Sequence, residues 1–391
     1  MRFEAPCWPE FGDREEETVL AAVRSGSWWR NEGSAVSGFE EAFGALEEVP
    51  YVIGVTNGTH ALELALLASG VGADDKVLLP AMTFYSSLSA VQRHGATPVI
   101  ADVDLSTWTL DVAAVRDAGL DHDLAGVVPV HYGGVPADLG AVARLAADRD
   151  LAVVQDAAHG PGIRPQGASL MGSGGTVGWS FQHSKLLPGG EGGAVGFGDE
   201  TAYRRALALQ NCGRVPGAAG YDHQEVASNF RMPELTGALL TAQLERFSDL
   251  AARRRQGAAR LRARLAEVEG LELQRAASAT DVESYYLVQA RLVLPGAGAA
   301  ARDRVVSDLV ADGVPVSRTY PPLFTLPAYA GAPEKGTSLA ELHERCPHSV
   351  LIGETGLSFH HRVLLAPADE LDRLGDLVEA AVRAAEGVVT R

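Results

Sequence analysis

The stretch SFQHSKLLPGGEGGAV, residues 180–195, places one lysine, Lys185, between a polar cluster and a glycine-rich run. A lysine that is desolvated in a folded protein can lose its proton and act as an amine nucleophile. The glycines at positions 189, 190, 192 and 193 would let a backbone pass close to a planar ligand, although a glycine-rich turn between two strands gives the same pattern. Lys185 is therefore a candidate for covalent chemistry.

A second pair of polar residues follows an apolar run. In LAVVQDAAHG, residues 151–160, a strand-like segment leads into Asp156 and then His159. A bare buried carboxylate costs several kcal/mol, so Asp156 needs a positive partner or dense hydrogen bonding. Taken singly, a helix cap at Asp156 and a satisfied core histidine at His159 are the simpler explanations. Asp156 and Lys185 each follow a strand, however, and could meet at the carboxyl edge of one sheet, where open α/β folds bind ligands.

An anion site is indicated where VTNGTHALELAL, residues 55–66, turns from a strand into a helix through Asn57, Gly58 and Thr59. The free N–H groups and the dipole of the helix would bind a phosphate there. Asn and Thr in front of an apolar run are also ordinary N-cap residues. Phe84, in PAMTFYSS, follows another strand end and offers an aromatic face, unless it is an ordinary core phenylalanine.

Together these groups match one cofactor. A phosphate cradle, an aromatic plate, a carboxylate and a Schiff-base lysine are what pyridoxal phosphate needs. The carboxylate would keep the pyridine nitrogen protonated, so that the ring can accept electrons from a substrate carbanion, and the lysine would move the proton. No G-x-G-x-x-G follows a candidate strand, which argues against a nicotinamide enzyme.

The elements that must position these residues alternate along the chain. From about residue 51, short β-branched runs alternate with helical patterns, which is typical of a mostly parallel sheet with helices on both faces. A long helix is expected from about Pro233 to Leu265, followed by a second α+β pattern and a final amphipathic helix. We expect two domains: residues 1–245 form an N-terminal arm and the large cofactor-binding domain, and residues 246–391 form a small C-terminal domain.

Composition narrows the classes of partner. The 391 residues include 33 Lys and Arg against 50 Asp and Glu, a formal net charge of −17, so no nucleic-acid partner is expected. The three cysteines, Cys7, Cys212 and Cys346, lack metal-ligand spacing, and no metal is expected. No stretch approaches about 18 consecutive apolar residues, and the acidic N-terminus has no apolar leader segment. We expect a cytoplasmic protein that binds no membrane.

Six motifs occur in a fixed order: TNGTHALELAL, PAMTFYSS, VVQDAAHG, SFQHSK, GEGGAV and SNFRMPEL. On these motifs the chain resembles the DegT/DnrJ/EryC1/StrS family of sugar and cyclitol aminotransferases, over nearly its whole length. The resemblance implies an aspartate-aminotransferase-like fold, fold type I. In that fold a large α/β domain with a mostly parallel, seven-stranded sheet between helices binds pyridoxal 5'-phosphate, and a smaller C-terminal α+β domain follows. It also implies a homodimer with shared active sites.

The resemblance further implies which residues hold the cofactor. Lys185 would bind it covalently, Asp156 would contact the pyridine nitrogen, and His159 would lie at the ring edge. Phe84 would stack on the ring, and Asn229, in SNFRM, would reach the phosphate from the other subunit. The remaining implied contacts, all to the phosphate, are Gly58, Thr59 and Ser180.

For the reaction we expect transfer of an amino group from glutamine or glutamate to a cyclic ketone, a keto-cyclitol or a nucleotide-linked keto-sugar, in specialised-metabolite (antibiotic) biosynthesis. The stretches SGSWWRNEG, NCGR and HHRVLLA are similar to a family member that instead aromatises an amino-dehydroshikimate by dehydration. That member has Asn-Gly where this chain has His183-Ser184, and it differs around Gly217 to Val226, so both reactions stay open. A cofactor-binding sensor without turnover is the alternative from another class.

Several other side chains have two explanations each. The cluster of Trp28, Trp29 and Arg30 either faces the substrate or packs the N-terminal segment onto a partner subunit. His360, His361 and Arg362 either bind the carboxylate of a substrate or form a solvated turn. The roles of Tyr132 and Tyr320 are undecided.

Overall fold

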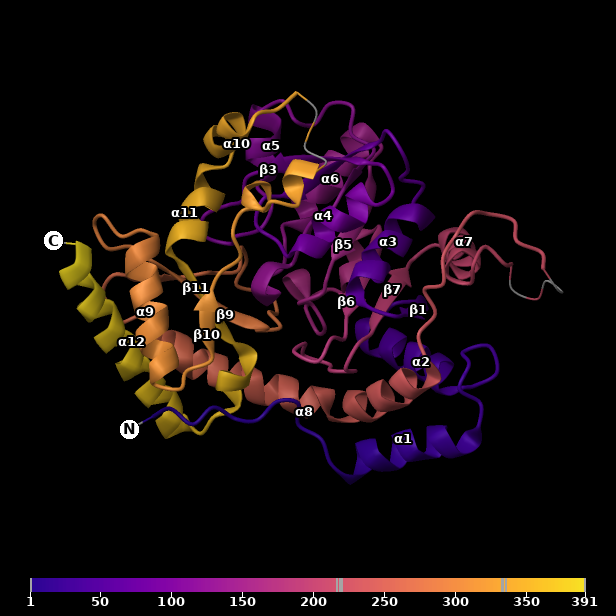
Figure 1. The fold of residues 1–391 in the computed structure, drawn as a ribbon, viewed down its shortest axis with the longest axis horizontal. Coiled ribbons are helices and arrows are strands. Elements are labelled where there is room, and N and C mark those ends of the chain that lie inside the picture. The colour runs from indigo at the N-terminus through magenta and orange to yellow at the C-terminus, as the bar shows by residue number, and fades with distance from the viewer. Residues whose placement is uncertain (1, 216, 218–220, 332–333, 335, 390–391) are drawn as a thin grey trace.

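The computed structural model describes residues 2–215, 217, 221–331, 334 and 336–389 (Figure 1). Residues 218–220, within the stretch that differs from the aromatising relative, lie outside the described residues. The strands of the larger sheet are β1 (Tyr51–Val55), β2 (Lys76–Pro80), β3 (Thr97–Ala101), β4 (Gly126–Val127), β5 (Ala152–Asp156), β6 (Thr176–Ser180) and β7 (Gly193–Phe197).

This sheet has seven strands in the order β1-β7-β6-β5-β4-β2-β3. Strand β7 is antiparallel to both of its neighbours, and the other pairs are parallel. The expected mostly parallel sheet is therefore confirmed, with one reversed strand, β7, which follows β6 without an intervening helix. Strand β4 is short because Pro129, just beyond it, has no N–H to donate to a neighbouring strand.

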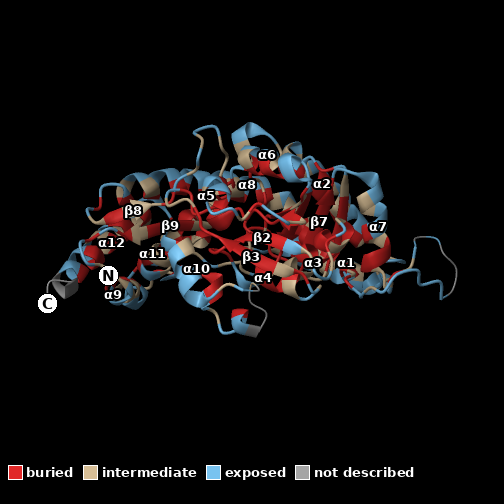
Figure 2. Cartoon of the chain, turned by 90° about the horizontal axis from the view of Figure 1, so that it is seen from above, coloured by how far each residue is buried: buried red, intermediate tan, exposed pale blue. Residues whose placement is uncertain are grey.

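Helices cover both faces of the sheet, as expected from the alternating pattern. Figure 2 shows α2 and α6 on one side, α3 and α4 on the other, and buried strands between them, and α7 packs against α3. The helices that precede or flank this sheet are α1 (Asp13–Ser25), α2 (Ala35–Glu47), α3 (Gly58–Ala68), α4 (Tyr85–Gln92), α5 (Val112–Asp117), α6 (Leu139–Arg149) and α7 (Glu200–Gln210).

A second unit is built around a smaller antiparallel sheet with the order β10-β11-β9-β8. Its strands are β8 (Leu271–Leu273), β9 (Leu287–Leu292), β10 (Val316–Arg318) and β11 (Gly356–His360). Its helices are α9 (Ala299–Ala311), α10 (Leu339–Arg345), α11 (Pro347–Thr355) and α12 (Ala368–Val389). Both chain ends lie beside this unit (Figure 1).

The long helix α8 (Glu234–Leu265) joins the two units and confirms the expected helix within one residue. Leu240 and Phe247, in its first half, pack in the core of the large sheet, whereas Ala258 and Leu261 pack in the second core. We therefore propose that the boundary between the domains lies inside α8, close to the expected position after residue 245. Within the described part of the chain, no helix is both long and apolar enough to cross a membrane.

Candidate active site

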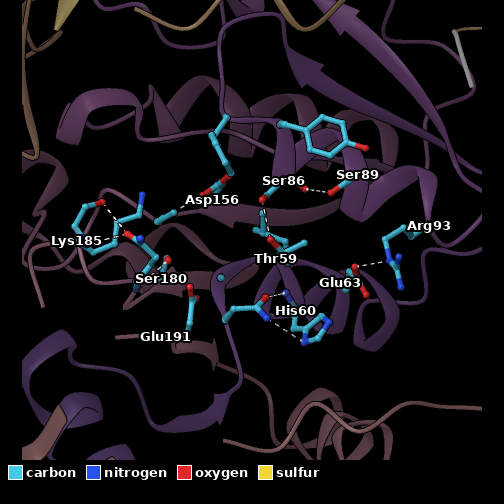
Figure 3. Close-up of a pocket in the computed structure, with 18 of the residues that line it drawn as sticks. Thr59, His60, Glu63, Ser86, Ser89, Arg93, Asp156, Ser180, Lys185 and Glu191 are labelled. Atoms are coloured by element: carbon cyan, nitrogen blue, oxygen red, sulfur yellow. Dashed lines mark hydrogen bonds and ion pairs between the residues drawn. The ribbon is translucent and has the colours of Figure 1, made fainter. Parts of the chain in front are cut away.

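A cavity of about 860 Å³ lies at the carboxyl ends of β5 and β6, where α3 and α4 begin. This size falls within the range of about 300–1,000 Å³ that is usual for ligand pockets. Of the residues implied to hold the cofactor, six line the cavity: Gly58, Thr59, Phe84, Asp156, Ser180 and Lys185. Figure 3 shows Asp156, Ser180 and Lys185 at one side of the cavity and Glu63 with Arg93 at the other.

The start of α3 forms one wall of the cavity. The side chain of Asn57 accepts a hydrogen bond from the His60 N–H at 2.9 Å, so Asn57 is an N-cap residue. The cap satisfies one of the N–H groups that a helix N-terminus leaves without an intrahelical partner, and the remaining groups suit an anion. A Cβ at Gly58 would lie 2.6 Å from the Ser180 Cβ, so only glycine lets helix and strand approach this closely. The N-cap explanation is confirmed, and the phosphate site at this turn stays a prediction.

Lys185 enters the cavity from the loop that follows β6. Its Nζ lies 4.4 Å from the centroid of the Tyr286 ring, which is within cation–π distance. The Tyr286 hydroxyl in turn lies 3.3 Å from the Ser184 Oγ. Tyr286 immediately precedes β9 of the second unit, so the lysine lies between the two parts of the chain.

Asp156 is the last residue of β5 and is buried. The Ser87 hydroxyl donates to its Oδ2 at 2.6 Å, and the Ala158 N–H donates to its Oδ1 at 3.0 Å. Burial raises the pKa of Asp156, and these two hydrogen bonds and the charge of Lys185 oppose that rise. No ion pair to Asp156 is formed by the described residues. A buried, hydrogen-bonded carboxylate without an ion pair fits a protonated ring nitrogen.

His159 lies behind the cavity rather than in its wall. Its Nδ1 accepts the Gly133 N–H at 3.2 Å, and its ring stacks on Tyr286 with 4.1 Å between centroids. Burial, helped by the charges of Lys185 and His131, lowers the pKa of His159 well below its usual value. The imidazole is therefore neutral, with its proton on Nε2. His159 is a buried histidine whose Nδ1 is hydrogen-bonded, and its ring packs on the Tyr286 ring that contacts the lysine.

The structure supports a contact with a ligand for Phe84 but not for the glycine-rich run. Phe84 is 53% exposed and lines the cavity, so it is not a core phenylalanine in this chain. A Cβ at Gly193 would lie 2.5 Å from the Asn57 backbone, and a Cβ at Gly189 would lie 2.8 Å from Leu240. These glycines permit close packing within the protein, so the structure favours the turn explanation over contact with a ligand.

Other candidate residues lie away from the cavity of their own chain. Asn229 is exposed, and its Oδ1 accepts the Arg231 N–H at 3.2 Å. Trp28 and Trp29 are exposed, and Arg30 pairs with Glu40.

Of the five remaining undecided residues, three are buried or line the cavity, and His360 and Arg362 are half-buried. His361 is 0% exposed, so the solvated-turn explanation is wrong for it. Tyr132 is buried, and its hydroxyl lies 2.7 Å from the Thr319 Oγ1. Tyr320 lines the cavity, with its ring 5.6 Å from that of Phe84.

Sequence reasoning missed three side chains of the site. Ser87 lies inside the motif PAMTFYSS, where a hydroxyl close to a candidate aromatic plate could have been noticed. Glu191 lines the cavity from the glycine-rich run. Tyr286 comes from the second unit, and no local pattern around it signals contact with Lys185.

The comparisons with known proteins agree with this geometry. Residues 10–376 match the sequence profile of the DegT/DnrJ/EryC1/StrS aminotransferase family. The chain is 37% identical over 383 residues to 3-amino-5-hydroxybenzoate synthase of Amycolatopsis mediterranei, covering 97% of each protein. It is 33% identical to L-glutamine:2-deoxy-scyllo-inosose aminotransferase of Streptomyces kanamyceticus, covering 96% of this chain and 92% of that one.

A crystal structure of 3-amino-5-hydroxybenzoic acid synthase has the same fold, with a TM-score of 0.95 at 35% identity, covering 98% of this chain and 100% of that one. The resemblance seen in the sequence motifs, including the aromatising member as a near relative, is thus confirmed. The cavity offers a helix N-terminus for a phosphate, a buried acid for a ring nitrogen and a lysine amine, which are the groups that pyridoxal phosphate requires. The chain belongs to the DegT/DnrJ/EryC1/StrS aminotransferase family and is a pyridoxal-phosphate-dependent aminotransferase.

Proposed function

We propose that the enzyme transfers an amino group from glutamine or glutamate to a cyclic ketone, a keto-cyclitol or a nucleotide-linked keto-sugar, in specialised-metabolite biosynthesis. The observation that carries this proposal is the meeting, in one cavity, of Lys185, Asp156 and the N-terminus of α3. Relatives named as L-glutamine-dependent aminotransferases of inosose compounds support the donor and the acceptor class.

When bound, pyridoxal phosphate supplies an electron sink for the electrons of a bond at the amino-bearing carbon. Lys185 takes a proton from that carbon of the donor at its Nζ and returns it to the carbon of the acceptor. The Asp156 carboxylate holds a proton on the ring nitrogen and so keeps the sink effective. The first N–H groups of α3, beginning at Gly58, bind the phosphate.

The polar groups of the cavity wall favour an acceptor that carries several hydroxyl groups. Arg93 is the arginine among the described lining residues, and it pairs with the buried Glu63 at 2.8 Å. This ion pair uses the Nε of Arg93, so it holds the guanidinium beside Glu63 at the edge of the cavity. The hydroxyl and amide groups of the wall, including Ser86, Ser89 and Gln182, suit the hydroxyls of a sugar or a cyclitol ring.

A second candidate is the dehydration that aromatises an amino-dehydroshikimate. It is favoured by the 37% identity and the TM-score of 0.95 to 3-amino-5-hydroxybenzoate synthase. In that reaction Lys185 would take a proton from the substrate, and the six-membered ring of the substrate would lose a hydroxyl group as water. The sensor without turnover is less well supported, because Lys185, Asp156 and His159 are all present and the family is one of aminotransferases.

The assembly and the location belong to the same proposal. Asn229 lies on the surface, outside the cavity of its own chain, which suits a residue that acts in a partner's site. We propose a homodimer with shared active sites, located in the cytoplasm. Size-exclusion chromatography with light scattering would find a dimer, and a stable monomer that retained full activity would contradict this part of the proposal.

The two reactions can be separated with the purified, cofactor-loaded enzyme. Glutamine or glutamate alone should convert the cofactor to its aminated form, seen as loss of the visible absorbance band, and 2-deoxy-scyllo-inosose, scyllo-inosose or a nucleotide-linked keto-sugar should restore it. Lys185→Ala should abolish the conversion, whereas Lys76→Ala, at an exposed lysine, should not. If no amino donor is consumed while amino-dehydroshikimate yields an aromatic product, the aromatising reaction replaces our proposal.

A further inference from the structure

The loop that carries Lys185 is held from behind by two side chains that are distant in the sequence. Trp8, in the N-terminal segment that runs along α8 (Figure 1), donates its Nε1–H to the carbonyl of His183 at 3.1 Å. His361, in the turn after β11, places its Nε2 at 3.0 Å from the carbonyl of Ser184. A carbonyl oxygen only accepts, so the Nε2 of His361 carries the proton.

The peptide between Ser184 and Lys185 is bonded at both ends. Its carbonyl accepts from His361, and its N–H donates to the main-chain carbonyl of Gln182 at 2.7 Å. A peptide unit is planar, so fixing its oxygen and its nitrogen fixes the orientation of the whole plane. That plane contains the N and Cα of Lys185, so its orientation fixes the point from which the side chain leaves the main chain.

The preceding peptide, between His183 and Ser184, is held in the same way. Its carbonyl accepts from Trp8, and its N–H donates to the Gln182 Oε1 at 2.8 Å. Two successive planes in front of Lys185 are thus fixed. One donor comes from the N-terminal segment, and the other comes from the second unit.

The two donors also contact each other. Their rings meet edge to face, with 4.5 Å between the centroids of Trp8 and His361. The guanidinium of the buried Arg254 lies 5.9 Å from the ring of Trp8, which is half-buried. Burial, helped by the charges of His360 and Arg254, lowers the pKa of His361 well below its usual value, so the imidazole stays neutral. Neither Trp8 nor His361 lines the cavity.

We propose that Trp8 and His361 are positioning residues for Lys185, which fix its Nζ at the place from which it moves the proton during amino transfer. The proposal rests on the proposed function, in which Lys185 is the lysine that binds the cofactor. It predicts that substituting Trp8 or His361 changes the reactivity of Lys185, although neither residue lines the cavity.

The test uses the loaded, full-length enzyme and three histidine variants. His361→Phe keeps a ring but removes the donor, and His361→Gln offers an amide N–H in place of Nε2–H. The matched control is His348→Phe, because the Nδ1 of His348 lies 2.9 Å from the Val103 carbonyl, away from the cavity. We expect His361→Phe to lower kcat about tenfold, because small misplacements of reacting groups are costly, with little change in KM.

A readout without turnover accompanies the kinetics. In the absence of substrate, the pH midpoint of the cofactor's visible absorbance should fall by about half a unit in His361→Phe. The reason is that a misplaced Lys185 Nζ loses its contact with the Tyr286 ring, which stabilises a positive charge on that nitrogen. Trp8→Phe should act in the same direction. His361→Gln should restore the midpoint and most of kcat, and His348→Phe should change neither. Thermal unfolding of each variant shows that it is folded.

The proposal is overturned if folded His361→Phe matches His348→Phe in kcat and in midpoint, or if His361→Gln is as impaired as His361→Phe. Borohydride reduction and peptide mass spectrometry separate this failure from failure of the proposed function. The chain has three lysines, Lys76, Lys185 and Lys335, so the modified one is readily identified. Cofactor found on another lysine would refute the site assignment, and with it this inference.

Discussion

The hydrogen bond from Ser87 to Asp156 allows a quantitative test of the site. The Ser87 hydroxyl donates to the buried carboxylate at 2.6 Å. Deleting a hydrogen bond to a charged group costs about 1.5–3 kcal/mol, which corresponds to a rise of about 1–2 units in the pKa of Asp156. Ser87→Ala should therefore slow the glutamine half-reaction about tenfold to a hundredfold, because the acid holds the ring proton less well.

The change in the pKa of Asp156 sets the direction in which the pH profile of the half-reaction moves. Burial already raises the pKa of Asp156, and the bond from Ser87 lowers it, so losing that bond raises it further. The carboxylate would then be protonated at a higher pH, and the acid limb of the rate profile should move toward neutral pH. Stopped-flow absorbance with glutamine, repeated across the pH range, measures both the rate and the limb.

Ser349→Ala is the matched control, because the Ser349 hydroxyl also donates at 2.6 Å to a buried aspartate, Asp102, outside the cavity. Both variants should lose comparable thermal stability, but only Ser87→Ala should change the half-reaction. A wild-type rate and pH profile in Ser87→Ala, or an equal slowing in Ser349→Ala, would refute the role given to Asp156.

Two further predictions concern the phosphate end of the cavity and acid stability. Gly58→Ala should weaken cofactor binding at least about tenfold in a spectroscopic titration, since its Cβ would lie 2.6 Å from the Ser180 Cβ and displace the start of α3. Gly38→Ala, whose Cβ would meet nothing within 4 Å, should bind the cofactor normally. Equal affinities in the two variants would contradict a phosphate site at the start of α3. Burial lowers the pKa of His131 to about 4, so below the ordinary histidine value the unfolded chain binds a proton that the folded chain does not. Stability should therefore fall as the pH drops from about 6.5 toward 4, by up to about 1.4 kcal/mol per unit from this group. His131→Gln should reduce that dependence in urea unfolding measured at several pH values, and an unchanged dependence would contradict it.

The sequence was sufficient to predict the elements that carry their own periodicity. Strands such as YVIGV and GAVGF are almost wholly buried, so their sequences are continuous apolar runs. The helix from Glu234 to Leu265 was expected within one residue, because its apolar spacing is sustained over many turns. Strand β11, in contrast, was not anticipated, because GLSFH is a short run with few apolar residues that directly follows helix α11.

The residues of the site likewise fall into those that the sequence predicts and those that it does not. Gly58, Asp156 and Lys185 follow strands of one sheet, so their meeting could be inferred from topology alone. Tyr286 and His361 reach the lysine loop from the second unit, about 100 and 176 residues further along the chain than Lys185. Such contacts depend on how the two units pack, which local sequence patterns do not encode.

The assignment of the active site depends most directly on which amine of the chain binds the cofactor. We would reduce the cofactor-loaded enzyme with borohydride, digest it and locate the modified peptide by mass spectrometry. We expect the modification on Lys185 and none in Lys185→Ala. Modification of Lys76 or Lys335 in its place, or an unmodified chain, would contradict this assignment.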